Sequence, residues 1–476
     1  MKKHLFINGA WKEASVYTEL YSPFSGELIA EVAQASELET DEAIQAAKAA
    51  AVKMAKMPAH ERAAILDKVA DLMDKRKEEL ARILALEVAK PIRTARGEIA
   101  RTIQTYKFAA MEARRIHGET VPLDAAPGGE GRIAFTMRKP IGVVGAITPF
   151  NFPFNLVAHK VGPAIAAGNT VVLKPASQSP LSALVLAEIF LEAGLPAGAL
   201  NVVPGKGTVV GEKLVTDRRV AAITFTGSPE VGIALKNKAG LKRVTLELGS
   251  NSALIIDHMV ELTQELIGRC ILGAFSFSGQ VCISIQRILV HENKYEEFIK
   301  KLKEAAEKLI VGNPLDETTD ISALISEKDV KRMEQWVASA SARGAQIVTG
   351  GKATSSRLIP ATILTNVPED EPVSCQEVFG PIVTVSSFTT IDQAIEAVNN
   401  SRYGLQAGIY TDDITTAMRV AEELEVGGVM INDFPTFRVD NMPYGGVKES
   451  GIGREGVKYA VEEMTELKLV VIKLKR

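Results

Sequence analysis

Apolar residues recur at helical intervals in the first quarter of the chain. Between residues 41 and 116 they fall three or four positions, or a helical multiple, apart, with Lys, Asp and Glu between them, as at Ile65, Val69 and Leu72. This period predicts amphipathic helices whose charged faces meet solvent. Thr40, which precedes two acidic residues, predicts the start of the first helix.

Short β-branched runs replace this pattern after residue 141. The segments IGVVGAIT, NTVVLKP, ALNVVP and AAITFTG predict strands, and LSALVLAEIFLEAGL and PEVGIALKNKAG predict helices between or after them. Strands that alternate with helices in this way favour a parallel sheet with helices on both faces. The sequence therefore predicts an α/β fold for this region.

A second alternating region follows Glu247. It contains the predicted helices EEFIKKLKEAAEKLI and IDQAIEAVNN and the predicted strands ALII and TVSSF, which indicates a second α/β domain. Residues 121–132 are rich in Pro and Gly and predict a loop or arm. The β-like tail ELKLVVIKLKR has no neighbouring partner strand in the sequence, so we expect it to pair with residues 132–138, within the chain or on another subunit.

Length and charge limit the classes of function. A chain of 476 residues exceeds one ordinary core, so two domains and a smaller appendage are expected. The net charge is only -3 and charged residues make up 24% of the chain, so no long-range field favours nucleic acid or a membrane. The expected ligand is a small molecule.

Cysteine usage and the absence of long apolar runs predict a cytoplasmic protein. The three cysteines, Cys270, Cys282 and Cys375, form no C-x-x-C pair, which is typical of a reduced compartment. No apolar run reaches the length of a membrane span, and the N-terminus lacks the apolar core of a signal peptide. No Cys and His cluster has metal-ligand spacing, so no metal is expected.

Three residues could carry chemistry. Cys282 ends FSFSGQVC, where Gly279 would break a helix and leave a thiol on a loop, although a free cysteine is often only a small buried hydrophobe. Glu247 interrupts an apolar strand, either as a general base with a raised pKa or as a structural carboxylate paired with Arg or backbone N-H groups. Asn151 in ITPFNFP could simply form a turn, or its amide could donate to an oxyanion.

The candidate cofactor residues also have two interpretations each. The segment GKGTVVG does not match the G-x-G-x-x-G turn of dinucleotide folds. Gly227 and Ser228 lie between a strand and a helix, either as a plain turn and N-cap or as a pyrophosphate site at free N-H groups. Lys174 ends a strand, where doubly wound sheets bind ligands, unless it is simply solvated.

Seven segments together resemble the aldehyde dehydrogenase superfamily, in its order and over nearly the whole chain. They are TPFNFP, NTVVLKPA, FTGSPEVG, LELG, FSFSGQVC, QEVFGPIV and PYGGVKESGIGREG. The resemblance implies that Cys282 is the nucleophile, Glu247 the general base and Asn151 the amide that holds an oxyanion. It implies that NAD or NADP is bound by Thr148, Pro149, Lys174, Ser177, Gly207, Gly227, Ser228, Glu377 and Phe379.

The resemblance also implies an architecture. A Rossmann-like NAD(P)-binding domain is expected at 1–120 and 139–249, and an α/β catalytic domain at 250–440. A small β oligomerisation arm with the C-terminal segment is expected at 121–138 and 441–476, which would join subunits into a homodimer or homotetramer.

These residue types permit a definite chemistry. A thiolate adds to an aldehyde, Asn151 and the backbone N-H of Cys282 hold the oxyanion, and hydride leaves to the nicotinamide. Glu247 then activates the water that hydrolyses the thioester to a carboxylic acid. Ser177 stands where NAD-preferring relatives often carry a glutamate that repels a 2′-phosphate, so NADP is admitted.

The substrate is the least determined part of the prediction. The segments LELGSNS and FRVDNMPYGG resemble the branch of the family that includes lactaldehyde, sulfolactaldehyde and phosphonoacetaldehyde dehydrogenases. They resemble non-phosphorylating glyceraldehyde-3-phosphate dehydrogenases more distantly. Those enzymes often carry an arginine immediately before the nucleophile, where this chain has Val281. Arg115 and Arg438 could clamp an anionic group, or could be structural. We expect a small hydroxylated or acid-bearing aldehyde. The alternatives are an acylating enzyme that uses coenzyme A, which Glu247 argues against, and a non-catalytic protein of this fold.

Overall fold

A largely parallel β-sheet is the centre of one half of the protein. In the computed structural model, which describes residues 2–475, the strand order of this sheet is β22-β12-β11-β8-β9-β10-β2-β3. The inner five strands are parallel, and β8 and β9 are buried along their whole length, which fits their unbroken apolar runs. These strands are β8 (Val143–Ile147), β9 (Thr170–Lys174), β10 (Leu200–Val202), β11 (Val220–Thr226) and β12 (Arg243–Glu247).

The two ends of the chain complete this sheet. β2 (Leu5–Ile7) pairs antiparallel with β10 and carries β3 (Ala10–Lys12) on its outer side. At the opposite edge, β22 (Gly451–Ile452) pairs antiparallel with β12. The C-terminal segment therefore returns to the first sheet before it leaves the body of the protein.

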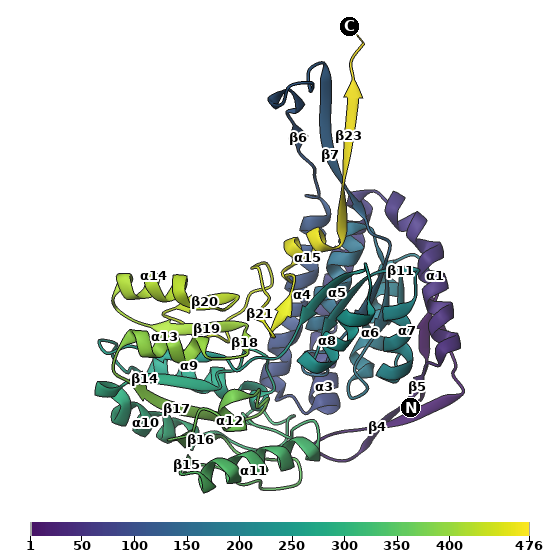
Figure 1. The fold of residues 1–476 in the computed structure, drawn as a ribbon. Helices are drawn as coiled ribbons and strands as arrows, with labels where there is room; N and C mark the ends of the chain where they lie inside the picture. The colour runs from purple at the N-terminus through teal and green to yellow at the C-terminus, as the bar shows by residue number, and fades with distance from the viewer. Residues whose placement is uncertain (1, 476) are drawn as a thin grey trace.

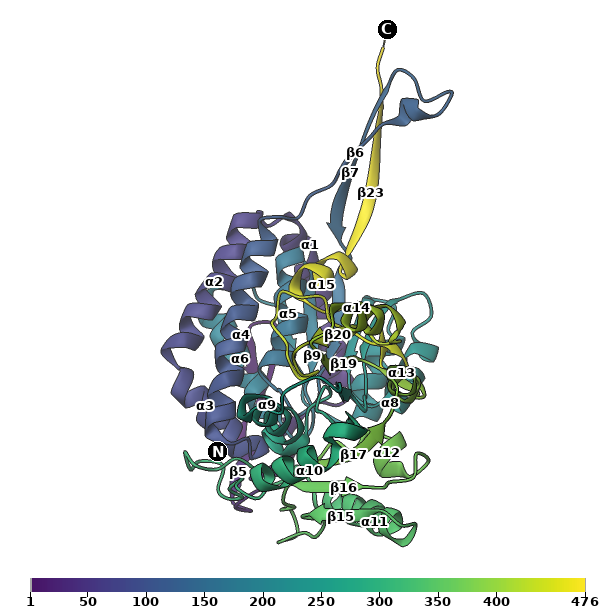
Figure 2. The same cartoon turned by 90° about the vertical axis from the view of Figure 1, so that its left-hand side faces the viewer.

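Helices cover both faces of the sheet, and each face has its own apolar cluster. Figure 2 shows α2, α3 and α4 gathered on one flank, and Figure 1 shows α1 on the opposite side of the sheet. The first face carries α2 (Ala59–Lys75), α3 (Lys77–Val88), α4 (Ile92–Ala113), α5 (Asn155–Ala167) and α6 (Pro180–Ala193), and the second carries α1 (Glu37–Lys56), α7 (Glu212–Thr216) and α8 (Pro229–Lys238). This confirms the predicted α/β fold.

The predicted start of the first helix at Thr40 is wrong. The helix α1 begins at Glu37, because Ser36 and Glu39 form a capping box that satisfies the first backbone N-H groups. Thr40 instead lies inside the first turn, where its hydroxyl donates to the Ser36 carbonyl.

The second half of the protein contains a seven-stranded sheet with the order β15-β16-β17-β14-β13-β19-β20. All neighbouring strands are parallel except β15 and β16. The strands are β13 (Ala253–Ile256), β14 (Arg287–His291), β15 (Gln346–Thr349), β16 (Thr362–Thr365), β17 (Ile382–Phe388), β19 (Gln406–Tyr410) and β20 (Gly428–Ile431), and the helices are α9 (Gln264–Phe275), α10 (Glu292–Ala306), α11 (Glu327–Ala342), α13 (Ile391–Asn399) and α14 (Ile414–Glu423).

A long β arm projects from the body of the protein (Figure 1). It is built from β6 (Thr120–Val121), β7 (Arg132–Pro140) and β23 (Thr465–Lys473), which follows α15 (Val457–Glu463). β23 and β7 pair antiparallel over nine residues, from Thr465 opposite Pro140 to Lys473 opposite Arg132. The expected partner of the C-terminal tail therefore lies in the same chain.

The remaining elements are short. They are β1 (Lys2–Lys3), β4 (Val16–Tyr21), β5 (Leu28–Gln34), α12 (Pro372–Cys375), β18 (Tyr403–Gly404), β21 (Val447–Lys448), and the turns η1 (Leu123–Ala125), η2 (Gly207–Gly211) and η3 (Ser276–Gly279). Within residues 2–475, no helix has the length and apolar character needed to cross a membrane. The same range contains no group of three or more His, Cys, Asp or Glu side chains arranged to hold a metal ion.

Candidate active site

The carboxyl ends of the five parallel strands bring most of the predicted site residues to one edge of the first sheet. Doubly wound sheets bind ligands at this edge, where the strand order reverses. Here the reversal is at β8, because β9 and β10 lie on one side of it and β11 and β12 on the other. The predicted residues that end or directly follow these strands are Thr148, Pro149, Asn151, Lys174, Ser177, Gly207, Gly227, Ser228 and Glu247.

The predicted cofactor residues at this edge differ in burial. Ser228 is exposed and caps α8, where its hydroxyl accepts from the Val231 N-H at 3.5 Å. Lys174 is buried, and desolvation lowers the pKa of its ammonium to about 8. Its Nζ donates to the Pro175 carbonyl at 3.1 Å, and within residues 2–475 it has no carboxylate partner. Ser177 is exposed on the loop between β9 and α6.

A strained loop after α9 carries Cys282. Phe277, Ser278 and Gly279 have successive positive φ angles of 49°, 53° and 69°. A Cβ at Gly279 would lie 2.1 Å from the Gly380 carbonyl oxygen, so only glycine fits there. The Ser278 hydroxyl donates to the Ser322 carbonyl at 2.9 Å and fixes the loop from its other side. Backbone strain of this kind, which the surrounding contacts impose, is common where a side chain must be held in one orientation.

The Cys282 thiol lies in a largely apolar setting at the junction of the two halves. Its Sγ is 3.0 Å from the Tyr444 hydroxyl. It packs in one apolar cluster with Phe152, Val281 and Ile283. Burial raises the pKa of Cys282 to about 11, although the Tyr444 hydrogen bond and the Arg438 charge act in the opposite direction. Burial at this position therefore favours the thiol over the thiolate.

Asn151 ties the first sheet to the Cys282 loop. Its Nδ2 donates to the Gln280 carbonyl at 3.0 Å, and its own carbonyl accepts from the Lys90 ammonium at 2.7 Å. The side chain is buried. An amide nitrogen carries two hydrogens, so the contact with Gln280 uses only one N-H of Asn151. The alternative of simple turn chemistry does not account for these two long-range contacts.

Glu247 is a buried carboxyl group at the end of β12. Neither of its oxygens has a hydrogen-bond partner within residues 2–475. Burial, together with the negative charge of Glu455, raises the pKa of Glu247 well above its ordinary value. This geometry does not fit the structural alternative, in which Arg or backbone N-H groups would pair with the carboxylate. An unpaired buried carboxyl group with a raised pKa has the properties of a general base.

Glu377 and Phe379 approach the same junction from the second half, in the segment before β17. The Glu377 Oε1 accepts from the Ser250 N-H at 3.0 Å, and burial raises the pKa of Glu377 to about 7. Phe379 has a positive φ of 51°, and its ring meets Phe150 edge-to-face at 5.8 Å. The structure thus brings Cys282, Asn151, Glu247 and this pair to facing loops of the two sheets.

A cavity of about 700 Å³ lies next to the loop that carries Cys282. Its lining includes Phe152, next to Asn151, and Val281, next to Cys282. It also includes Arg93, Arg101 and Arg438, against the acidic Glu98 and Asp320, so basic side chains predominate.

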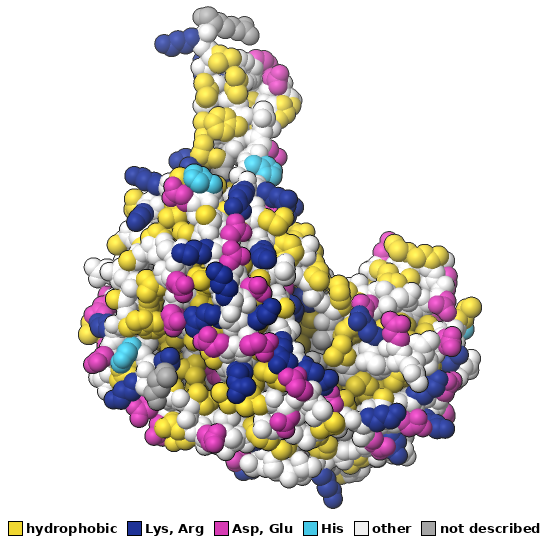
Figure 3. All heavy atoms as spheres, turned by 180° about the vertical axis from the view of Figure 1, so that it is seen from behind, with side chains coloured by type: hydrophobic (Ala, Val, Ile, Leu, Met, Phe, Trp, Pro, Cys, Tyr) yellow, Lys and Arg dark blue, Asp and Glu magenta, His cyan; other side chains and the backbone are white. Residues whose placement is uncertain are grey.

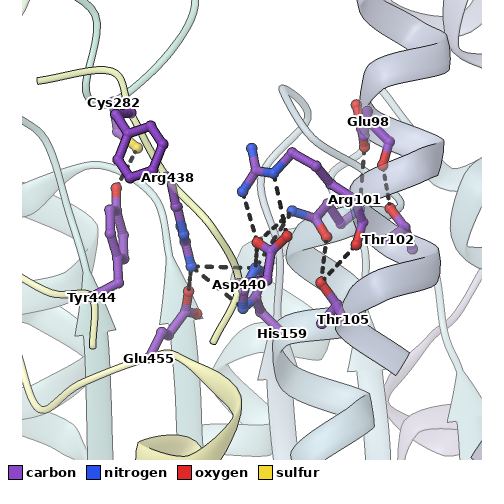
Figure 4. Close-up of polar contacts among 12 residues, drawn as sticks. Glu98, Arg101, Thr102, Thr105, His159, Cys282, Arg438, Asp440, Tyr444 and Glu455 are labelled. Atoms are coloured by element: carbon purple, nitrogen blue, oxygen red, sulfur yellow. Dashed lines mark hydrogen bonds and ion pairs between the residues drawn. The ribbon is translucent and has the colours of Figure 1, made fainter. Parts of the chain in front are cut away.

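Arg101 is a functional candidate that the sequence did not reveal. Its guanidinium donates to both oxygens of Asp440, at 2.7 and 3.3 Å, and its side chain is 33% exposed (Figure 4). Asp440 in turn accepts from, or pairs with, the ring of His159 at 2.8 Å. In the sequence Arg101 is only one of several charged residues in a helical stretch, and no local feature distinguishes it.

The hypothesis that Arg115 and Arg438 together clamp an anionic group is wrong, because the two residues line different cavities. Arg115 follows the end of α4, is 62% exposed and pairs with Glu112 at 3.5 Å. It lines a cavity of about 430 Å³ at the base of the arm, with Arg138 and Lys458. The prediction failed because the α4 residues that line the cavity beside Cys282, from Arg93 to Arg101, belong to the first half of this helix, whereas Arg115 follows its C-terminal end.

Arg438 does line the cavity beside Cys282, but it is almost fully buried. Its Nη2 pairs with Glu455 at 3.2 Å, and its guanidinium carbon lies 3.5 Å from the centre of the Tyr444 ring. Figure 4 shows Arg438 between Tyr444 and the group formed by His159 and Asp440.

Comparison with known proteins gives a consistent result. A profile described as the aldehyde dehydrogenase family matches residues 11–470. The chain is 51% identical over 472 residues to the 3-sulfolactaldehyde dehydrogenase of Priestia aryabhattai, across 99% of this chain and 98% of that protein. It is 41% identical over 475 residues to the lactaldehyde dehydrogenase of Methanococcus aeolicus, across 99% of this chain and 100% of that protein.

Solved structures also match over nearly the whole chain. The aldehyde dehydrogenase 21 of Physcomitrella patens, in complex with the reaction product succinate, has a TM-score of 0.97 and 42% identity over 99% of this chain and 98% of that chain. The NADP-dependent glyceraldehyde-3-phosphate dehydrogenase of Bacillus halodurans, complexed with NADP, has a TM-score of 0.97 and 37% identity over 100% of both chains.

The Gly279 geometry predicts a local loss of function. Gly279→Ala should displace the loop that carries Cys282, because its Cβ would overlap the Gly380 carbonyl oxygen. We expect alkylation of Cys282 by iodoacetamide, followed by mass spectrometry of its peptide, to change at least severalfold in rate. Gly26→Ala is the matched control, because Gly26 has a φ of 70° but no atom within 4 Å of the position that a Cβ would occupy. Equal effects of the two substitutions on Cys282 would contradict the role of the close approach.

Proposed function

This chain belongs to the aldehyde dehydrogenase family, and from that premise we propose how its own residues oxidise an aldehyde with NAD or NADP. The observation that carries the proposal is the meeting of Cys282, Asn151 and Glu247 at the junction of the two sheets. Each of them has a structural environment that suits one step of the reaction. In this assignment, residues 1–120 and 139–249 bind the cofactor and residues 250–440 supply the nucleophile.

The edge of the first sheet has features that fit a dinucleotide. The exposed N-terminus of α8, with Ser228 and Gly227 before it, offers backbone N-H groups to a pyrophosphate. Lys174 is a buried ammonium group without a carboxylate partner, which suits a donor to ribose hydroxyls. We assign the nicotinamide end to Thr148, Pro149, Glu377 and Phe379, and the adenosine end to Lys174, Ser177 and Gly207. The bound nicotinamide supplies a hydride acceptor.

Cys282 is assigned as the nucleophile. Its sulfur forms a bond to the aldehyde carbon after the thiol proton has passed to a base, and the carbonyl oxygen becomes an oxyanion. The second N-H of Asn151 and the backbone N-H of Cys282 donate to that oxyanion, which stabilises the tetrahedral adduct on the enzyme. Loss of hydride from this adduct leaves a thioester on Cys282.

Glu247 is assigned as the general base. Its carboxylate takes a proton from a water molecule, the resulting hydroxide attacks the thioester carbon, and the Cys282 sulfur leaves as the carboxylic acid forms. Because burial raises the pKa of Glu247, the carboxylate can accept a proton near neutral pH more readily than an exposed glutamate.

Glu247→Gln should separate the two stages of the reaction. We expect steady-state turnover to fall by roughly 10²- to 10⁴-fold, while one equivalent of reduced nicotinamide still forms in a rapid first turnover. In the unchanged enzyme, turnover should fall as the pH drops through the raised pKa of Glu247, because only the ionised form is a base. The variant should lose that limb of the pH profile.

Glu265→Gln is the control, because Glu265 is exposed in the first turn of α9. An unchanged steady-state rate in Glu247→Gln, or a pH profile identical to that of the control, would contradict the assignment of Glu247.

We propose a small aldehyde with an anionic or hydroxylated end as the substrate. The cavity beside Cys282 is lined by three arginines, and although each pairs with a carboxylate, Arg93 and Arg101 are partly exposed and can donate to an anion. The names of the relatives, 3-sulfolactaldehyde dehydrogenase and lactaldehyde dehydrogenase, and the succinate bound to a similar structure agree with this class. We propose that Arg101 and Arg438 bind the anionic end of the substrate, in place of Arg115 and Arg438, because both Arg101 and Arg438 line this cavity.

Arg101→Ala should distinguish charged from neutral substrates. We expect kcat/KM for an aldehyde that bears a carboxylate or sulfonate to fall by about 10- to 100-fold, because one charge-assisted contact is lost. For propanal the value should change by less than about threefold. Arg115→Ala is the control, since that side chain lines a different cavity, and it should leave both values unchanged. Equal losses for the two aldehydes in Arg101→Ala would contradict the proposal.

We further propose that the arm joins two or more copies of the chain. Leu467, Leu469 and Val471 alternate along β23, so they lie on one face of the strand, and each is about half exposed. Figure 3 shows hydrophobic side chains gathered on the arm. β23 is also an edge strand, with unpaired backbone groups on its outer side. A second copy of the chain would cover both features in a homodimer or homotetramer.

The assembly can be tested by sedimentation. Leu469→Glu should shift the protein toward a smaller species, because a charge would be buried in the contact. Val52→Glu, at an exposed hydrophobic position of α1, should leave the sedimentation coefficient unchanged. A purely monomeric unchanged protein would refute the proposed contact.

All three cysteines are free, which suits the reducing cytoplasm that we propose as the compartment.

A further inference from the structure

Tyr444 contacts the sulfur atom that the proposed mechanism uses, yet it takes no part in the steps assigned above. Its hydroxyl oxygen lies 3.0 Å from the Cys282 Sγ, although the two residues are far apart in the sequence. The Tyr444 side chain is only 3% exposed. In Figure 4 the phenol points directly at the sulfur from a loop of the C-terminal segment.

One face of the Tyr444 ring is covered by the Arg438 guanidinium. The guanidinium carbon of Arg438 lies 3.5 Å from the ring centre, close enough for a stacked cation–π contact. A positive charge on the ring face draws electron density from the phenol and makes its O-H a stronger donor. The phenol therefore meets the guanidinium through its ring face and the sulfur through its hydroxyl.

We propose that Tyr444 is a further catalytic residue, whose hydroxyl donates to the Cys282 thiolate and holds it ready for attack, with Arg438 strengthening that donor. The inference rests on the proposed role of Cys282 as nucleophile. A thiolate can only accept hydrogen bonds, and a phenol at neutral pH supplies one donor. The contact therefore stabilises the ionised sulfur more than the thiol.

The charges around Cys282 show why such a donor is needed. Glu377 and Glu247 both disfavour the thiolate, and burial disfavours it more strongly than either. Arg438 and the Tyr444 hydrogen bond are the influences that favour it. Without them, the sulfur would face two carboxyl groups in an apolar setting, with little to stabilise its negative charge.

Buried contacts fix the plane of Arg438 against the ring. Its Nη2 pairs with Glu455 at 3.2 Å and lies 3.3 Å from the His159 Nε2. Glu455 also binds the Lys160 ammonium at 2.8 Å. Burial alone would raise the pKa of Glu455, but the charges of Lys160, His159 and Arg438 hold it low, so the carboxylate stays ionised. The stack therefore does not depend on a mobile surface side chain.

The test is the pH dependence of Cys282 alkylation in the full-length protein without aldehyde. Iodoacetamide is added over a pH series, and the rate is read from the Cys282 peptide by mass spectrometry, so that Cys270 and Cys375 do not contribute. For Tyr444→Phe, which keeps the ring and its stack, we expect the midpoint to rise by about one pH unit and the rate below the midpoint to fall about tenfold. The alkaline shift should reappear in kcat/KM.

Tyr459→Phe is the matched control. Tyr459 is a partly buried tyrosine of α15 with the Lys458 ammonium 5.6 Å from its ring centre, and it does not contact Cys282. Its alkylation profile should coincide with that of the unchanged protein. Arg438→Lys, which keeps a charge beside Glu455 but loses the planar stack, should move the midpoint in the same direction as Tyr444→Phe.

Two results would overturn the inference. Coincident alkylation profiles for Tyr444→Phe and the unchanged protein would show that the hydroxyl does not stabilise the thiolate. A higher KM for hydroxylated aldehydes with an unmoved alkylation profile would make Tyr444 a substrate contact instead. Neither result touches the proposed function, which fails separately if Cys282 is not required for turnover.

Discussion

The position of one sulfur atom depends on how two sheets meet. Asn151 follows a strand of the first sheet, and its amide donates across the junction to the carbonyl of Gln280 in the Cys282 loop. The same loop is held from behind, because Gly279 packs against the Gly380 carbonyl with no room for a side chain. These contacts place the proposed nucleophile of one half beside the edge of the other half that we propose binds the cofactor. Neither half has the complete set of reacting groups.

Buried charges stabilise the surroundings of this junction. Lys90 and Glu98 form a fully buried ion pair, and the Lys90 ammonium also binds the Asn151 carbonyl. Lys160 and Glu455 form a second buried pair behind Glu247. A buried pair contributes little net stability, but removal of one partner is costly, so such pairs fix a single arrangement. Among residues 2–475 this arrangement leaves both oxygens of Glu247 without a hydrogen-bond partner, and burial raises its pKa, as the proposed role of base requires.

Much of the fold followed from local patterns in the sequence, whereas the substrate cavity did not. The β-branched runs became β8, β9, β10 and β11 because fully buried parallel strands tolerate unbroken apolar residues. Gly279 pointed to the Cys282 loop because glycine is needed where the backbone turns left-handed. Helix boundaries were less certain, as Ser36 shows, because a side chain outside the helix decides where it begins.

The contacts between distant residues could not be predicted in this way. Arg101 and Arg115 belong to one charged stretch, but Arg101 lies within α4 and Arg115 lies beyond its C-terminal end, so the two residues line different cavities. Tyr444 meets Cys282 through tertiary packing alone, so no spacing in the sequence indicates the contact. Resemblance to a family supplied the roles of Cys282, Glu247 and Asn151, and the structure adds the burial, pairing and charge that make those roles physically reasonable.

The proposed mechanism requires a covalent bond between the Cys282 sulfur and the substrate. The most direct measurement is the mass of the Cys282 peptide after the enzyme has been mixed with aldehyde and cofactor and quenched with acid within one turnover. We expect an added acyl group on Cys282, and no formation of reduced nicotinamide when Cys282 is replaced by alanine. Undiminished turnover in Cys282→Ala, or an acyl group on another residue, would contradict it.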